Sequence, residues 1–283
     1  MNLSPTRLIR RLCLARLACL ATGAAMGVPL LAQAQGLDHQ HKAWTALLKR
    51  HVVLQGGGSA SQLRYAGMAA DRALLKAYLD TLSAVSAASF ADFSKAQQMA
   101  FLINAYNAFT VELILTRYPK LASIRDLGSL LQNPWKPKFI ALLGTQMSLD
   151  GIEHETLRVR GRYDDPRIHF AVNCASIGCP MLREEAFVAE RLDAQLEEQS
   201  RRFMSDRSRN RYNPASGKLE LSKIFDWYGD DFKLGHMGIA SLAAFAARHA
   251  DLLAETPAER DKLRGLAVEV SFLDYDWKLN DVR

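Results

Sequence analysis

Two cysteines and two histidines near the middle of the sequence have the residue types of a thiol-dependent catalytic site. Cys174 follows an expected strand, residues 168–172, and begins a glycine-containing loop that ends at Cys179. At such a junction a side chain is held in place and can still be approached. A cysteine attacks an acyl carbon as its thiolate, so Cys174 needs a neighbouring base, and His154 and His169 are the candidates.

Strand geometry separates the two histidines. On a straight strand, the α-carbons of His169 and Cys174 lie roughly 16 Å apart and their side chains point to opposite faces. His154 precedes the strand on a short expected helix, which can fold back toward the end of the strand. The sequence therefore predicts Cys174 as nucleophile, His154 as base, and a backbone N–H of loop 175–178 as part of an oxyanion hole.

Two asparagines, Asn104 and Asn107, are three residues apart on an expected buried helix and therefore lie on one side of it. A buried amide without partners costs about 1–3 kcal/mol, so both need specific hydrogen bonds. Either they tie down the backbone of a neighbouring loop, or one of them orients His154, as an asparagine does in papain-like thiol enzymes. The second role rests on analogy of fold.

The two cysteines permit other interpretations. In an oxidising compartment a Cys174–Cys179 disulfide would staple the loop, contribute roughly 2 kcal/mol and silence the thiol. A reversible bridge would instead make the site redox-switched. Metal-ligand types are also present, Glu153 and His154 among them, but they lack a metal-binding spacing, so we expect no metal and no cofactor.

Acidic and aromatic residues gather late in the sequence. The acids are Asp230, Asp231, Asp274 and Asp276, and the aromatic residues are Trp227, Tyr228, Tyr275 and Trp277. Paired carboxylates would suit a glycosidase, but adjacent acids more often cap helices and turns. The aromatic rings either line a groove for an elongated ligand or pack in the core.

A helix-rich scaffold must position these residues. Apolar spacing predicts helices over 38–53, 69–85, 95–118, 150–158, 188–204 and 238–249, a hairpin over 139–149, and strands over 168–172, 218–221 and 268–273. Helix 95–118 begins with the capping-box pair Ser94 and Gln97 and is apolar nearly all round, so it should be central and buried. Residues 56–59 are expected to be a flexible connector. We therefore predict an α+β fold, a single helix-rich domain with a small, mostly antiparallel sheet around the central helix.

The first 34 residues have the pattern of a secretory signal peptide: a basic start, an apolar stretch and Ala32-Gln33-Ala34. We expect cleavage near Ala34 and a periplasmic or secreted domain, residues 35–283, with Arg10-Arg11 leaving the twin-arginine route open. Removing the four arginines of this segment lowers the net charge from +6 to +2, which argues against nucleic acid as a partner. No apolar run of about 18 residues follows, so we expect no transmembrane segment in the mature chain.

Five ordered motifs resemble one known family. They are residues 100–108 (AFLINAYNA), 149–154 (LDGIEH), 168–176 (IHFAVNCAS), 227–232 (WYGDDF) and 274–277 (DYDW). Together they are similar to the domain of unknown function 547 family, and the resemblance extends over nearly the whole chain after residue 34. It implies little about activity, because the family is named for its unassigned function.

Two functions remain open on the sequence. The first is an exported thiol-dependent hydrolase or acyl transferase with a Cys174/His154 dyad, acting on an unknown small molecule, peptide or glycan. The second is a non-catalytic envelope binding or scaffold domain, in which the Cys174–Cys179 disulfide is structural.

Overall fold

The computed structural model describes residues 36–128 and 133–282, and the residues from Gly36 onward form one compact unit. The expected signal peptide lies outside the described residues. The longer helices are α1 (Lys42–His51), α2 (Tyr65–Ala70), α3 (Arg72–Ser83), α4 (Ala87–Ala91), α5 (Lys95–Leu115), α7 (Leu192–Ser205), α9 (Leu242–Arg248) and α11 (Pro257–Arg264). Single turns are α6 (Leu149–Ile152), α8 (Ile224–Trp227), α10 (Ala250–Leu253), and the η turns η1 (Gly56–Gly58), η2 (Ile124–Leu127), η3 (Glu153–Leu157), η4 (Pro166–Phe170), η5 (Ala189–Arg191), η6 (Gly229–Lys233) and η7 (His236–Gly238).

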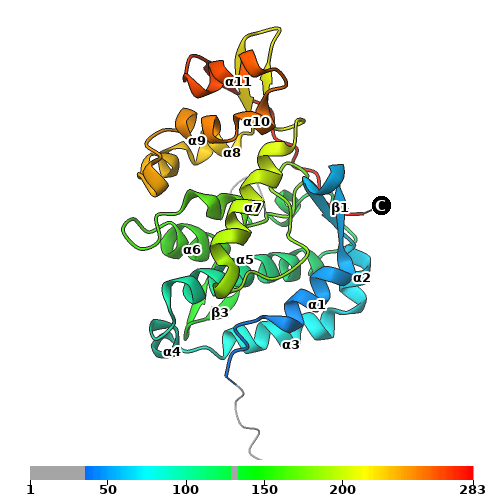
Figure 1. Ribbon diagram of the computed structural model, residues 1–283. Coiled ribbons are helices and arrows are strands. Elements are labelled where there is room, and N and C mark those ends of the chain that lie inside the picture. Colours follow the sequence, from blue (N-terminus) through cyan, green and yellow to red (C-terminus); the bar gives the residue numbers. More distant parts are fainter. Residues whose placement is uncertain (1–35, 129–132, 283) are drawn as a thin grey trace, which may run out of the picture. The chain divides into compact units, whose positions relative to one another are not determined.

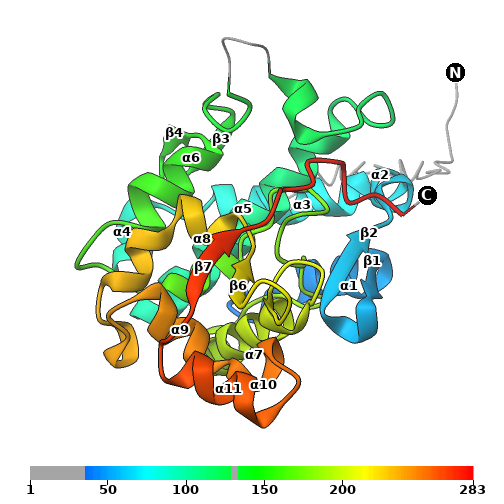
Figure 2. The same cartoon turned by 90° about the horizontal axis from the view of Figure 1, so that it is seen from above.

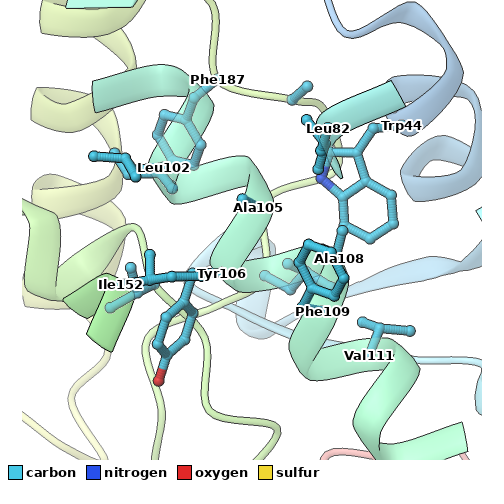
Figure 3. Close-up of a cluster of buried hydrophobic side chains, with 14 of the residues drawn as sticks. Trp44, Leu82, Leu102, Ala105, Tyr106, Ala108, Phe109, Val111, Ile152 and Phe187 are labelled. Carbon is cyan, nitrogen blue, oxygen red and sulfur yellow. The ribbon is translucent and has the colours of Figure 1, made fainter. Parts of the chain in front are cut away.

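Helix α5 is the central element, as predicted. Ser94 and Gln97 form the capping box at its start, and its side chains are buried on nearly every face from Met99 to Leu115. In Figure 1, α5 crosses the middle of the unit between α1 and α3 on one side and α7 on the other. Figure 3 shows its side chains projecting in several directions, toward Trp44 and Leu82 and toward Phe187 and Ile152. A helix apolar all round is stable only when it is enclosed in this way.

The strands form three small sheets. Two are antiparallel hairpins, β1 (Val52–Gln55) with β2 (Ala60–Leu63) and β3 (Ile140–Leu142) with β4 (Thr145–Met147). The third has β6 (Lys218–Leu221) at its centre, antiparallel to β5 (Arg211–Asn213) and parallel to β7 (Glu269–Phe272). The α+β, helix-rich prediction is confirmed, although the strands divide among three sheets.

The glycine run after α1 is the turn of a hairpin and not a flexible connector. Gly56, Gly57 and Gly58 all have positive φ, between 54° and 96°. This backbone region favours glycine, so the run reverses the chain between β1 and β2 at little steric cost.

A second apolar cluster lies between α7, α9 and the β5–β6–β7 sheet. Its centre is a group of stacked and tilted phenylalanine rings from five places in the chain: Phe170, Phe203, Phe225, Phe232 and Phe245. After β7 the chain runs back across the unit to the first hairpin, where Val282 donates its N–H to the carbonyl of Leu63 (Figure 2).

The predicted strand over 168–172 is wrong. Residues 166–170 form the 3₁₀ turn η4, because Pro166 stands at its first position and the side chain of Asp165 accepts the N–H of Arg167. A proline sets φ for a helical start and lacks an N–H that a sheet would use. The apolar residues of this segment reflect burial on two sides: Phe170 packs in the second cluster, and Ile168, Ala171 and Val172 pack in the cluster around α5. Within the described ranges, no helix is long and apolar enough to cross a membrane.

Candidate active site

A cavity of about 300 Å³ lies where α5, α6, η3, η4 and the C-terminal segment 273–282 meet. This volume is at the lower end for small-molecule sites. Its lining is Tyr106, Asn133, Trp135, Asp150, Glu153, His154, His169, Val172, Cys174, Cys179, Pro180, Ile224, Trp227, Tyr228, Tyr275 and Trp277. The two cysteines and both candidate histidines therefore border one space.

Cys174 and Cys179 form a disulfide on the cavity wall, with α-carbons 6.2 Å apart. Cys179 is buried, and Cys174 is partly accessible. The hydroxyl of Tyr275 lies 3.0 Å from the sulfur of Cys174. Burial raises the pKa of Tyr275, so its hydroxyl stays protonated and donates to that sulfur.

The loop between the cysteines has anchors besides the disulfide. Ile177 and Gly178 donate their N–H groups, at 2.8 Å each, to carbonyls of the segment 276–278. Arg209 donates to the carbonyl of Cys179. A β-carbon on Gly178 would lie 2.9 Å from the Tyr275 ring, so glycine is what allows the C-terminal segment to approach. None of these contacts involves a sulfur atom, so we expect them to hold the loop in the reduced protein as well.

Only one backbone N–H of loop 175–178 can serve in the predicted oxyanion hole. Ala175 donates its N–H to the side-chain oxygen of Asn173, and those of Ile177 and Gly178 are used by the C-terminal segment. Of the N–H groups in 175–178, the loop therefore offers at most that of Ser176. Ala175 also has a φ of 62°, a left-handed conformation that costs a non-glycine residue roughly 1–2 kcal/mol.

His154 lies on η3, a turn of π-helix, and its side chain is about one-third exposed. The guanidinium of Arg158 donates to its Nδ1 at 2.6 Å, and its Nε2 lies 3.8 Å from a carboxylate oxygen of Asp150. Because arginine only donates, the neutral ring of His154 carries its proton on Nε2. The Nδ1 lone pair of His154 is already engaged.

His169 has the opposite arrangement. Its buried ring donates Nε2–H to Asp231 at 2.7 Å and stacks on Tyr228 with ring centroids 4.0 Å apart. Burial alone would raise the pKa of Asp231, but hydrogen bonds from His169 and Arg158 outweigh it and lower that pKa. Asp231 is therefore an ionised acceptor, and in the neutral ring of His169 the lone pair is then on Nδ1. That atom is buried and has no hydrogen-bond partner among the described residues.

The sequence argument against His169 as the base assumes a straight strand from His169 to Cys174. The structure has the 3₁₀ turn η4 there instead. The face alternation of a strand therefore does not apply to His169 and Cys174, and both line the cavity. Asp231 accepts from His169 across 62 residues, a role that the sequence does not indicate, since adjacent acids suggest only a cap or a carboxylate pair.

Comparison with known protein families gives a match for the central part of the chain. Residues 90–204 match the family described as "Protein of unknown function, DUF547". The chain carries a DUF547 domain. The match is shorter than the resemblance expected from the five motifs, since those at 227–232 and 274–277 lie beyond it. Comparisons with curated proteins and with solved structures gave no match.

The DUF547 match contains two acids of the cavity that the sequence interpretation did not assign to catalysis or binding, Asp150 and Glu153. Burial raises the pKa of Asp150 against the opposing effect of His154, and the charge of Glu153 adds to the rise. Glu153 is 5% exposed. Burial raises the pKa of Tyr106 and Tyr228, and the negative charge of Glu153 raises both further. The spacing of four residues between Asp150 and His154 could have indicated that both lie on one face of a helix. No such local signal indicates that Glu153 points inward from η3.

Asn104 and Asn107 of the DUF547 domain bind backbone and do not line the cavity. Asn104 exchanges two hydrogen bonds with the backbone of Phe187, at 2.7 and 3.0 Å. Asn107 donates to the carbonyl of Ala171 at 2.9 Å and accepts the N–H of Asn173 at 2.8 Å. Asn107 thereby fixes the residue immediately before Cys174, which is the loop-tying role and not contact with a histidine.

The aromatic residues late in the sequence line the cavity, and the acidic residues near them do not all do so. All four aromatic residues, from Trp227 to Trp277, border the cavity, and Trp227 is 42% exposed. Asp230 instead pairs with Lys233 at the surface. In the part of the chain that the structure describes, no group of three or more His, Cys, Asp or Glu side chains is arranged to hold a metal ion.

Proposed function

We propose that the protein is an exported thiol-dependent hydrolase or acyl transferase in which Cys174 is the nucleophile. One observation carries the proposal: His169, with its Nε2–H on Asp231 and a bare Nδ1, borders the same cavity as the sulfur of Cys174. A carboxylate on one imidazole nitrogen fixes the tautomer and leaves the other nitrogen free to take a proton. We assign His169 as the base, beside His154, which the sequence favoured.

The reaction begins from the reduced site. A dithiol reductant opens the Cys174–Cys179 bridge and becomes a disulfide itself, so two electrons and two protons pass to the cysteines. The Cys174 thiol then gives its proton to the histidine, and the thiolate attacks the acyl carbon of an ester or amide. The leaving group departs with that proton, and water or an acceptor nucleophile releases the acyl group from the thioester.

We assign two donors to this chemistry, one beside the sulfur and one in the cysteine loop. The Tyr275 hydroxyl, 3.0 Å from the sulfur, stabilises negative charge on it. The N–H of Ser176 is the loop donor available for the oxyanion of the acyl group. Asn107 acts as a positioning residue through the backbone of Asn173.

Alkylation of a single-thiol variant tests the proposal and the choice of base. Cys179→Ala leaves Cys174 as the one cysteine after residue 34. We expect iodoacetamide to modify it rapidly well below pH 8, read by intact mass from pH 5 to 9. Adding His169→Asn should slow modification at pH 6.5 at least tenfold, while His154→Asn should change it less than threefold. A profile like that of an ordinary exposed thiol contradicts the proposal, and the reverse order of the two histidines reassigns the base.

Turnover provides the second readout. With a dithiol present, wild-type protein should hydrolyse p-nitrophenyl acetate catalytically, and Cys174→Ser should abolish turnover without unfolding the protein. Unchanged turnover in Cys174→Ser would exclude Cys174 as the nucleophile.

The disulfide itself favours one alternative, a non-catalytic envelope binding or scaffold domain. In that case no electrophile labels the reduced protein selectively at Cys174, and loss of either cysteine lowers stability by a similar amount. Both functions fit an oxidising compartment, since disulfides persist there. Export with cleavage near Ala34 predicts a processed protein in the periplasm or medium, which N-terminal mass mapping detects.

A further inference from the structure

Six of the sixteen described residues that line the cavity are tryptophan or tyrosine. Rings of Trp135, Trp227, Tyr275 and Trp277 form a continuous series, with neighbouring centroids 4.5–6.0 Å apart. The faces of aromatic rings carry negative potential and attract cations. Two lining rings already do so: Arg125 lies over Trp277 at 5.2 Å, and Arg158 lies over Tyr228 at 4.7 Å.

The charges that line the cavity have one sign. Asp150 and Glu153 are its acids, and no lysine or arginine is among its described lining residues. Arg158, which lies over the lining ring of Tyr228, is paired with Asp231, with Nε 2.6 Å from the carboxylate. Asp150 lies 3.8 Å from His154, and the charge of Lys136, which does not line the cavity, also acts on it. Two partly or wholly buried carboxylates beside aromatic faces leave the cavity short of positive charge.

We propose that the cavity binds a cationic group, an ammonium or a guanidinium, and that the substrate carries this group beside the acyl group that Cys174 attacks. The position of the acyl group beside Cys174 rests on the proposed function, whereas the binding of a cation does not. Aromatic faces and carboxylates are the usual recognition elements for such ions. The acyl end would face the two cysteines, which border the same cavity as the rings and the carboxylates.

Choline and 3,3-dimethylbutan-1-ol, which have the same shape and differ in charge, test the binding. Titrations of wild-type protein, followed by tryptophan fluorescence, should show choline binding at least tenfold more tightly than the alcohol. Asp150→Asn should weaken choline binding about tenfold and leave the alcohol unchanged. Asp230→Asn is the matched control, because it removes the same charge at an exposed site paired with Lys233. Equal binding of the two probes, or equal effects of the two substitutions, would overturn the inference.

Ester pairs separate this inference from the proposed function. If both are right, acetylcholine should be hydrolysed with a kcat/KM at least tenfold above that of 3,3-dimethylbutyl acetate, and Cys174→Ser should lose hydrolysis while still binding choline. If only the thiol chemistry is wrong, neither ester is turned over and the choline preference remains. If only the cation site is wrong, both esters are hydrolysed with equal kcat/KM.

Discussion

Opening the Cys174–Cys179 bridge should lower the free energy of unfolding by about 2 kcal/mol and leave the loop in place. The bridge closes a loop of about six residues, for which the chain-entropy relation gives about 2 kcal/mol at 25 °C. No further loss is expected, because Ile177, Gly178 and Arg209 hold the loop independently of the sulfurs. The bridge is thus a small addition to a loop that is already anchored.

Urea unfolding of oxidised wild type, reduced wild type and Cys179→Ala measures this difference. The two proteins without the bridge should agree within about 1 kcal/mol, with the slope of the unfolding free energy against urea unchanged. A loss above about 4 kcal/mol, or a changed slope, would mean that the bridge itself holds the loop. The independent-anchor reasoning would then be wrong, and the scaffold function would gain support.

Three further predictions concern named side chains. Burial lowers the pKa of His41 to about 4, so the unfolded chain binds the extra proton and stability should fall by about 3 kcal/mol from pH 7 to pH 4; urea unfolding should show this slope largely absent in His41→Gln, and an unchanged slope refutes the assignment. Gly178→Ala should cost about 1–3 kcal/mol and displace Tyr275, seen in thermal unfolding and Cys174 alkylation, whereas Gly229→Ala, with open space around it, should cost much less. Asn107→Ala should cost about 2–4 kcal/mol, because it strands two buried backbone groups; a loss below 1 kcal/mol in urea unfolding contradicts that role.

Local signals in the sequence predict the scaffold well. The Ser94 capping box and the apolar surface of α5 depend on residues within a few positions of each other, and the structure has both. The hairpin over 139–149 likewise follows from a short turn between alternating residues. Segment 168–172 fails because apolar composition indicates burial without specifying conformation, and Pro166 decides the outcome.

The site is less predictable, because its parts meet through long-range packing. Asp231 reaches His169 across 62 residues, and Tyr275 reaches Cys174 across 101. The spacing of residues along the chain carries no information about such meetings. The motif at 227–232 did contain Asp231, but only the fold shows that this carboxylate selects the tautomer of a buried imidazole.

The segment 273–282 also sets when the cavity can exist. It supplies Tyr275 and Trp277 to the wall, holds the cysteine loop, and pairs at Asp281 with Leu63, 218 residues earlier. Proteins are made from the N-terminus onward, and contacts between distant residues form late in folding. A chain still in synthesis therefore has Cys174 without its surroundings. The thiol meets its complete cavity only after the whole domain has been made, so any reaction there belongs to the folded protein and not to the growing chain.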